Sequence, residues 1–145
     1  MPIASAGETI TGMYLFDTDI ITGIFKPTPS KRLLEKLARI PKEHQHISAI
    51  TIYEIVYGAH RSSRKDHHLR NLQELLLPAV QVVDFDARAA FICGALRAEL
   101  ESSGAPLALA DLQVASIAIA NDLILITGNV KHFRIVAKLK VENWL

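Results

Sequence analysis

Three acidic residues follow, or lie within, apolar stretches of a chain that is otherwise suited to burial. Asp17 comes directly after the apolar residues 13–16, Glu54 lies just beyond the stretch HQHISAI, and Asp111 stands in the almost wholly apolar segment LALADLQVASIAIAND. Several carboxylates without His or Cys beside them are hard oxygen ligands, which suit Mg²⁺ or Mn²⁺ better than Zn²⁺. Because Mg²⁺ characteristically joins protein carboxylates to substrate phosphate, these residue types indicate phosphate-ester chemistry.

Each of these carboxylates also has a purely structural explanation. Asp17 or Asp19 could cap a following helix, Glu54 could form a capping box with Thr51, and the macrodipole could stabilise Asp111 at a helix N-terminus. These explanations account less well for three acids with little positive charge nearby, because burying an unpaired charge is costly. We therefore predict that Asp17, Glu54 and Asp111 converge within a few ångströms of one ion position.

Short apolar stretches alternate with helical patterns along the whole chain. We expect strands at 13–16, 44–50, 79–85, 123–127 and 138–145, and helices at 19–25, 30–40, 51–61, 66–77, 86–103 and 107–122. This alternation is typical of βαβ units and predicts an α/β fold, with a parallel sheet covered by helices on both faces. The carboxyl ends of such strands meet in one crevice, which is where the three acids would gather.

The composition fits one globular domain rather than a disordered or fibrous chain. Half of the 145 residues are hydrophobic and 21% are charged, which allows a core that buries roughly two thirds of the unfolded surface. Sixteen Lys and Arg residues stand against fifteen Asp and Glu residues, for a net charge of +1. Any contact with nucleic acid therefore has to use a local basic patch.

The single cysteine and the N-terminal residues indicate the cellular setting and the domain limits. Cys93 lies among apolar neighbours and has no partner for an internal disulfide, which fits a reducing cytoplasm. No apolar run approaches the ~20 residues that span a bilayer, so we expect a cytoplasmic protein without a membrane anchor. Residues 1–12 are small and polar, so we expect a flexible tail there and one folded domain over 13–145.

Four blocks in the sequence together resemble a known family. The blocks LFDTDI, ISAITIYEIVYGA, ADLQVASIAIAND and LITGNVKHFRIVAKLKVENW, in this order, are similar to those of the PIN-domain ribonucleases, and specifically of the VapC toxins of bacterial toxin–antitoxin pairs. The resemblance covers residues 13–145, nearly the whole chain. It implies a PIN-like α/β/α sandwich with a central parallel sheet of about five strands.

The same resemblance assigns roles to individual residues. Asp17, Glu54 and Asp111 match the acidic metal ligands of the family. Asn129 falls where many relatives carry a fourth acid or an Asn, and Thr127 matches a hydroxyl residue that commonly lines the same strand end, so both join the candidate catalytic residues. Asp19 stands where relatives usually have Asn, which suggests a role at the start of a helix rather than as a ligand.

The implied activity is that of a Mg²⁺- or Mn²⁺-dependent endoribonuclease. Such an enzyme hydrolyses a phosphodiester bond in tRNA or another structured RNA with a metal-activated water, and the sequence does not identify the acid that accepts the water's proton. The resemblance also implies a cognate VapB-like antitoxin and a homodimer. Apolar residues around the whole circumference of one predicted helix, among them Tyr53 and Tyr57, agree with a second interface.

Basic residues that could contact RNA gather in residues 60–70 and after the strand that ends at Thr127. The candidates are Arg61, Arg64, Lys65, Lys131 and His132. A solvated junction between two helices explains the first three at least as well as RNA contact does, and an exposed turn explains Lys131 and His132. His44 and His46 alternate on one strand face without a third ligand, and we expect His67 and His68 on different sides of a helix, so we interpret neither pair as a metal site.

Two other functions stay open from the sequence alone. LFDTDIIT also resembles the start of haloacid-dehalogenase-type phosphatases, with Asp17 as the nucleophile and Asp19 as the acid/base. That family needs a further acidic pair on a later strand, and Glu142 is the only acid after Lys131. The other alternative is a catalytically silent PIN domain that acts as a binding module, although all three expected acids are present.

Overall fold

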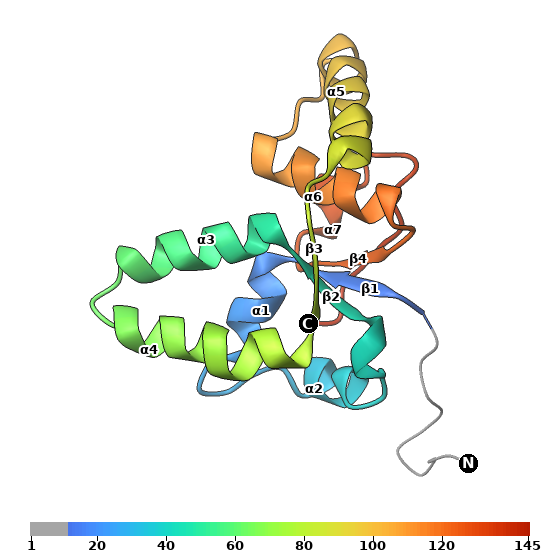
Figure 1. The fold of residues 1–145 in the computed structure, drawn as a ribbon. Helices are drawn as coiled ribbons and strands as arrows, with labels where there is room; N and C mark the ends of the chain where they lie inside the picture. The colour runs from blue at the N-terminus through green and yellow to red at the C-terminus, as the bar shows by residue number, and fades with distance from the viewer. Residues whose placement is uncertain (1–11) are drawn as a thin grey trace.

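A central sheet of parallel strands organises the protein, whose computed structural model describes residues 12–145. The strands are β1 (Tyr14–Phe16), β2 (Gln45–Ser48), β3 (Gln81–Val83), β4 (Ile124–Ile126) and β5 (Val141–Glu142). Their spatial order is β3-β2-β1-β4-β5, and each neighbouring pair runs parallel (Figure 1). The predicted α/β fold with a five-stranded parallel sheet is thus confirmed. The expected tail over residues 1–12 lies, apart from Gly12, outside the described residues.

Helices connect consecutive strands, as parallel pairing requires. The α-helices are α1 (Thr18–Ile24), α2 (Lys31–Leu37), α3 (Ala49–His60), α4 (Lys65–Arg70), α5 (Ala87–Ser102), α6 (Leu109–Ala120) and α7 (Val130–Phe133). Three short segments complete the set: the 3₁₀ turn η2 (Lys42–His44), the π-helical turn η3 (Asn71–Leu76) and the 3₁₀ turn η4 (Leu77–Ala79). The single helix predicted over 66–77 is therefore α4 continued by a π-helical turn.

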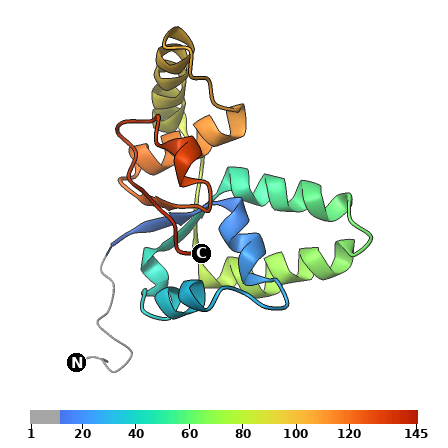
Figure 2. The same ribbon diagram turned by 180° about the vertical axis from the view of Figure 1, so that it is seen from behind.

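The sheet separates two apolar clusters, because successive side chains on a strand point to opposite faces. Leu15 and Leu125 pack with α5, α6 and α7 on one face. Phe16 and Ile126 pack with α1, α2 and η3 on the other. Figures 1 and 2 show α5 and α6 together on one side of the sheet, and α3 and α4 as a helical hairpin that projects from it.

Helix α3 begins earlier than the sequence pattern suggests, and its cap is a different residue. Ser48 is the N-cap, and its hydroxyl accepts a hydrogen bond of 3.1 Å from the Thr51 amide. The predicted capping box between Thr51 and Glu54 is wrong. Thr51 lies inside the first turn of the helix, and its hydroxyl is fully buried beside Ser48.

The C-terminal residues close the cluster beneath β1. The Trp144 ring is 1% exposed, and its centroid lies 4.8 Å from that of Tyr14 and 5.9 Å from that of Phe16. Because β1 ends at Phe16, this packing braces the strand that carries Asp17. Cys93 is buried on α5, as predicted, and none of the helices in the described part of the chain has the length and apolar character to cross a membrane.

Candidate active site

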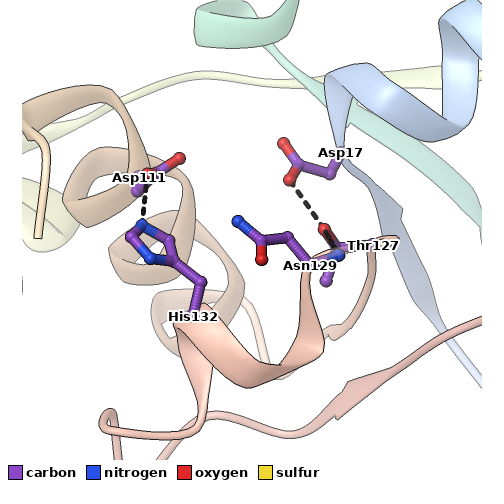
Figure 3. A network of polar contacts seen from close by, with 5 residues as sticks. All are labelled: Asp17, Asp111, Thr127, Asn129 and His132. Carbon is purple, nitrogen blue, oxygen red and sulfur yellow. Dashed lines mark hydrogen bonds and ion pairs between the residues drawn. The ribbon is translucent and has the colours of Figure 1, made fainter.

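Asp17 and Thr127 stand side by side because they follow two neighbouring parallel strands. Asp17 is the first residue after β1, and its amide donates to the Ile126 carbonyl of β4 at 2.9 Å. Asp17 is also the N-cap of α1, where its Oδ1 accepts a 2.9 Å hydrogen bond from the Thr18 amide. Its Oδ2 accepts a second bond, of 3.0 Å, from the Thr127 hydroxyl (Figure 3). Both carboxylate oxygens are therefore held by the protein.

The environment of Asp17 disfavours its negative charge. Burial, with smaller contributions from the neighbouring carboxylates Asp19 and Asp111, raises the pKa of this carboxyl from its ordinary value of 3.8 to about 6. The hydrogen bonds from the Thr18 amide and the Thr127 hydroxyl act in the opposite direction on this pKa and do not outweigh burial. A cation beside Asp17 would relieve the same repulsion.

Asp111 is engaged by a histidine that the sequence did not place there. The carboxylate lies in the first turn of α6, and its Oδ2 is 2.9 Å from Nε2 of His132 on α7 (Figure 3). We had considered His132 for contact with RNA, not as a partner of Asp111. The contact joins residues 21 positions apart in the chain, so no local pattern signals it.

Asn129 and Thr127 lie close to the two acids, in the segment that follows β4. In Figure 3 the Asn129 side chain extends into the space between Asp17 and Asp111. The backbone amide of Asn129 donates a 3.1 Å hydrogen bond to the Thr127 hydroxyl, and this bond fixes the turn after β4. Both residues thus lie at the edge of the sheet, on the side of Asp17.

Glu54 is linked to Asp17 through Thr18, by a contact that no local sequence pattern predicts. The Thr18 hydroxyl donates to Oε1 of Glu54 at 2.6 Å and lies 3.3 Å from the Thr51 hydroxyl. Among the described residues, Glu54 Oε2 has no hydrogen-bond partner. One oxygen of this carboxylate is therefore fixed, and the other is free for a ligand.

Asp19 holds a strand-to-helix turn rather than serving only at a helix start. Asp17 supplies the N-cap of α1, whereas Asp19 Oδ2 accepts a 2.9 Å hydrogen bond from the Gly128 amide. A Cβ on Gly128 would lie 2.8 Å from that same oxygen, so a larger residue there would force the Asp19 side chain to shift. Asp19 thus ties α1 to the turn that carries Asn129.

The carboxylates do not converge on one ion position as predicted. Within residues 12–145, no three His, Cys, Asp or Glu side chains are grouped closely enough to hold a metal ion. The reason is that each acid has its own protein partner: Thr127 and the Thr18 amide for Asp17, the Thr18 hydroxyl for Glu54, and His132 for Asp111. The donor chemistry nonetheless fits a hard divalent cation, since the side chains of Asp17, Asp111 and Asn129 offer only oxygen ligands of the kind that Mg²⁺ and Mn²⁺ prefer.

A groove of about 470 Å³ adjoins Glu54 and Thr18 and runs between α1 and the α3–α4 hairpin. Apolar side chains such as Ile21, Ile55 and Leu72 line it, together with the basic or titratable groups Lys26, Arg64, His67 and His68. Of the other basic candidates, Arg61 bonds to the Tyr57 hydroxyl, and Lys65 and Lys131 are exposed.

Two further histidines, on or next to β2, have backbone partners. His44 and His46 each place Nδ1 about 3 Å from a backbone carbonyl, those of Gly12 and Tyr14. The rings of His67 and His68 lie 5.5 Å apart and line the same groove, although we had expected them on different sides of their helix.

Comparison with known proteins now decides the family. The sequence pattern of the PIN domain matches residues 14–139. This chain belongs to the PIN-domain family. It is 34% identical to Ribonuclease VapC2 of Rickettsia felis, an alignment that covers 91% of this chain and 98% of that one. It is 30% identical to the tRNA(fMet)-specific endonuclease VapC of Shigella flexneri, over 90% and 97% of the two chains.

A solved structure supports the same assignment. The PIN domain described above matches the crystal structure of VapBC2 from Rickettsia felis, bound to a DNA fragment from their promoter, with a TM-score of 0.82 and 31% identity. The match covers 92% of this chain and 99% of that one. The resemblance to VapC ribonucleases is confirmed, and the alternative of a haloacid-dehalogenase-type phosphatase is set aside.

Proposed function

We propose that this PIN domain is a Mg²⁺- or Mn²⁺-dependent endoribonuclease toxin that cleaves phosphodiester bonds in tRNA or another structured RNA. The observation that carries the proposal is the pair Asp17 and Asp111, which lie on either side of Asn129 at the carboxyl edge of the sheet. The names of the ribonuclease and endonuclease relatives agree with this chemistry. The half-buried Asp17 carboxyl, whose pKa is raised, is a group whose negative charge a cation would stabilise.

Asp17 and Asp111 would hold the ion. The side-chain carbonyl of Asn129 would lie beside them, and Oε2 of Glu54 would lie at the edge of the site. When bound, the ion supplies a nucleophilic water and offsets charge on the phosphate. The protein contributes orientation: Thr127 and the Thr18 amide fix both oxygens of Asp17. One of the carboxylates would take the proton of the attacking water.

Basic side chains near the acids would position the RNA. Lys131 is exposed on α7, one residue before His132, and both could contact the phosphate next to the bond that is cleaved. Arg61, Arg64 and Lys65 lie at or near the turn between α3 and α4, the outer end of the hairpin in Figure 1. They would contact a more distant part of the RNA backbone.

Cleavage of a total tRNA pool by the purified chain tests this function. We expect discrete fragments with Mg²⁺ or Mn²⁺ and none with EDTA, and mapping the fragment ends would identify the substrate. The Asp17→Asn variant should lose cleavage, because the side chain that replaces the carboxylate is neutral. Fragments that persist in this variant would contradict the site, and a chain that binds RNA without cutting it would be the silent binding module.

We further propose a VapB-like antitoxin as the partner that controls this site. The solved relative from Rickettsia felis is a VapBC complex. The apolar groove beside Glu54 and Thr18 suits an apolar segment of such a partner, because its apolar lining leads directly to two residues of the site. A segment bound there would cover Glu54 and keep RNA from the acids.

A further inference from the structure

Thr18 occupies a position between the two acids that approach from different elements. Its backbone amide donates to Oδ1 of Asp17 at 2.9 Å, and its hydroxyl donates to Oε1 of Glu54 at 2.6 Å. Asp17 follows β1, whereas Glu54 lies in the second turn of α3, 36 positions from Thr18. One residue therefore sets the position of both carboxylates, through two different atoms.

The hydroxyl groups of Thr51 and Ser48 continue the hydrogen-bonded series from Thr18. The Thr51 hydroxyl lies 3.3 Å from the Thr18 hydroxyl, and the Ser48 hydroxyl lies 3.4 Å from that of Thr51. A hydroxyl has one proton, and an ionised carboxylate can only accept. Since the Thr18 proton goes to Glu54, the Thr51 hydroxyl has to donate to Thr18 and the Ser48 hydroxyl to Thr51.

This order of donors and acceptors strengthens the hydrogen bond from the Thr18 hydroxyl to Glu54. Ser48 and Thr51 are fully buried, and hydrogen bonds in series polarise one another where water is excluded. Ser48 is itself fixed, because its oxygen accepts from the Thr51 amide as the N-cap of α3. The start of α3 therefore directs three hydroxyl groups, in sequence, toward one oxygen of Glu54.

We infer that Thr18 is a positioning residue, which holds Oε1 of Glu54 so that Oε2 is presented on the same side as Asp17. The inference rests on the proposed function only in that Glu54 there serves the metal ion and the substrate. Thr18 itself would touch neither. Thr127 has the corresponding role for Asp17, because its hydroxyl donates to Oδ2 of that carboxylate.

The test compares the wild type and three variants of the full chain. Each is titrated with Mn²⁺, and the electron paramagnetic resonance signal of the free ion measures how much Mn²⁺ is bound. Thr18→Val keeps the shape of the side chain and removes the hydroxyl, and Thr18→Ser keeps the hydroxyl. Thr22→Val removes the other threonine hydroxyl of α1, which within residues 12–145 bonds only to the Asp19 carbonyl. We expect Thr18→Val to lower Mn²⁺ affinity by about 10-fold or more, as removal of groups behind a metal ligand does. Thr18→Ser and Thr22→Val should bind as the wild type does.

RNA cleavage gives a second measurement on the same variants. Thr18→Val should lower kcat at saturating Mn²⁺ while KM for RNA stays near the wild-type value, because Thr18 does not contact the substrate. Thermal unfolding without metal shows whether Thr18→Val is folded; if it is not, Thr18→Ala replaces it. Equal Mn²⁺ affinity in a folded Thr18→Val or Thr18→Ala variant and the wild type would overturn the inference and leave the proposed function intact.

A wild-type chain that binds no Mn²⁺ would overturn the proposed function instead. The role of Thr18 is then judged from crystal structures of the wild type and Thr18→Val. We expect the Glu54 carboxylate to leave its place in the variant, and a carboxylate that keeps its place without the hydroxyl would overturn the inference.

Discussion

At the scale of single residues, the site places a negative charge where the surroundings disfavour it. Asp17 is held by two hydrogen bonds, yet burial and nearby carboxylates raise its pKa to about 6. Natural proteins accept such local costs mainly at functional positions. The charge of Asp17 therefore lowers the stability of the metal-free protein.

We predict that Asp17→Asn stabilises the metal-free protein at neutral pH. The folded chain binds the proton of Asp17 more tightly than the unfolded chain does, so the stabilisation from protonation is fully present below pH 3.8 and is lost as the pH rises through about 6. Above that pH the variant should unfold with a free energy about 1–3 kcal/mol higher than the wild type. Urea unfolding in EDTA at pH 4 and pH 7.5 measures the difference.

The control is Asp84→Asn, which removes a carboxylate from an exposed position. It should change the free energy of unfolding by less than about 0.5 kcal/mol at both pH values. If Asp17→Asn gives the same stability difference at pH 4 and pH 7.5, the charge of Asp17 is not the cause.

At the scale of elements, the helices deliver the acids through their first turns. Asp17 caps α1, Asp111 lies in the first turn of α6, and Glu54 lies one turn further along α3. Local sequence patterns predicted these helices and the strands before them, because burial period and caps are local properties. The parallel pairing of the strands followed from their alternation with helices, whereas their spatial order was not predicted.

The contacts between elements were beyond local sequence patterns. Thr18 reaches Glu54 and His132 reaches Asp111 only because the strands are packed side by side, and the residues in each pair are 36 and 21 positions apart. The capping box at Thr51 was predicted wrongly for a related reason. Ser48, at the end of β2, competes as the cap, and Thr51 and Glu54 are both drawn to Thr18.

The cap of α3 should matter for activity as well as for stability. Ser48→Ala leaves the buried Thr51 amide without its acceptor, and loss of an N-cap costs about 1 kcal/mol. Asp86→Ala is the matched change, since Asp86 caps α5 through the Ala89 amide at 2.9 Å. Both variants should lose similar stability in urea unfolding, and only Ser48→Ala should also slow RNA cleavage. Equal cleavage by the two variants would contradict the role of the α3 start in the site.

A second element-scale prediction concerns the groove along α3. Gly58 lines it, and a Cβ added there would meet no atom within 4 Å. Gly58→Trp should therefore fill the groove without disturbing α3, and weaken binding of a VapB-like antitoxin by about 10-fold or more, since complementary packing at a docking site is lost. Binding is measured by calorimetry with the cognate partner.

Gly94→Trp is the matched control for the groove. Gly94 lies on α5 with the same free space around its Cβ position, outside the groove. This variant should bind the antitoxin as the wild type does. Unchanged binding in Gly58→Trp would place the antitoxin elsewhere.

At the scale of the whole molecule, the C-terminus stabilises the strand that leads to the site. Trp144 is buried against β1, and its Nε1 donates to Glu142 at 3.0 Å. Trp144→Ala should lower the free energy of unfolding by about 3–5 kcal/mol, because a large cavity would form next to Tyr14 and Phe16. Chemical unfolding measures this loss, and Leu75→Ala, at an exposed position, should change stability little. A small effect of Trp144→Ala would mean that the C-terminal residues do not brace β1.

Large apolar side chains remain exposed on the helices that flank the sheet. Phe91 on α5 is 82% exposed, and on α3 the rings of Tyr53 and Tyr57, 64% and 54% exposed, stack with their centroids 6.4 Å apart. Exposed aromatic residues are enriched where proteins associate. We therefore propose that a second copy of the chain covers exposed side chains of this kind, Phe91 among them, in the homodimer that the resemblance implied.

Replacing Phe91 by Glu should weaken this homodimer. Burial of a Phe side chain contributes about 1.5–3 kcal/mol, so a charge at the same position should lower the association constant by at least about 10-fold. Sedimentation equilibrium of wild type and variant over a range of protein concentrations measures the constant. Leu75→Glu puts the same charge at an exposed apolar position on η3 and should leave association unchanged. A wild type with the mass of a single chain at every concentration would contradict the homodimer. Association of Phe91→Glu that is as strong as that of Leu75→Glu would place Phe91 outside the dimer interface, because a dimer that buried Phe91 could not accept an unpaired carboxylate there.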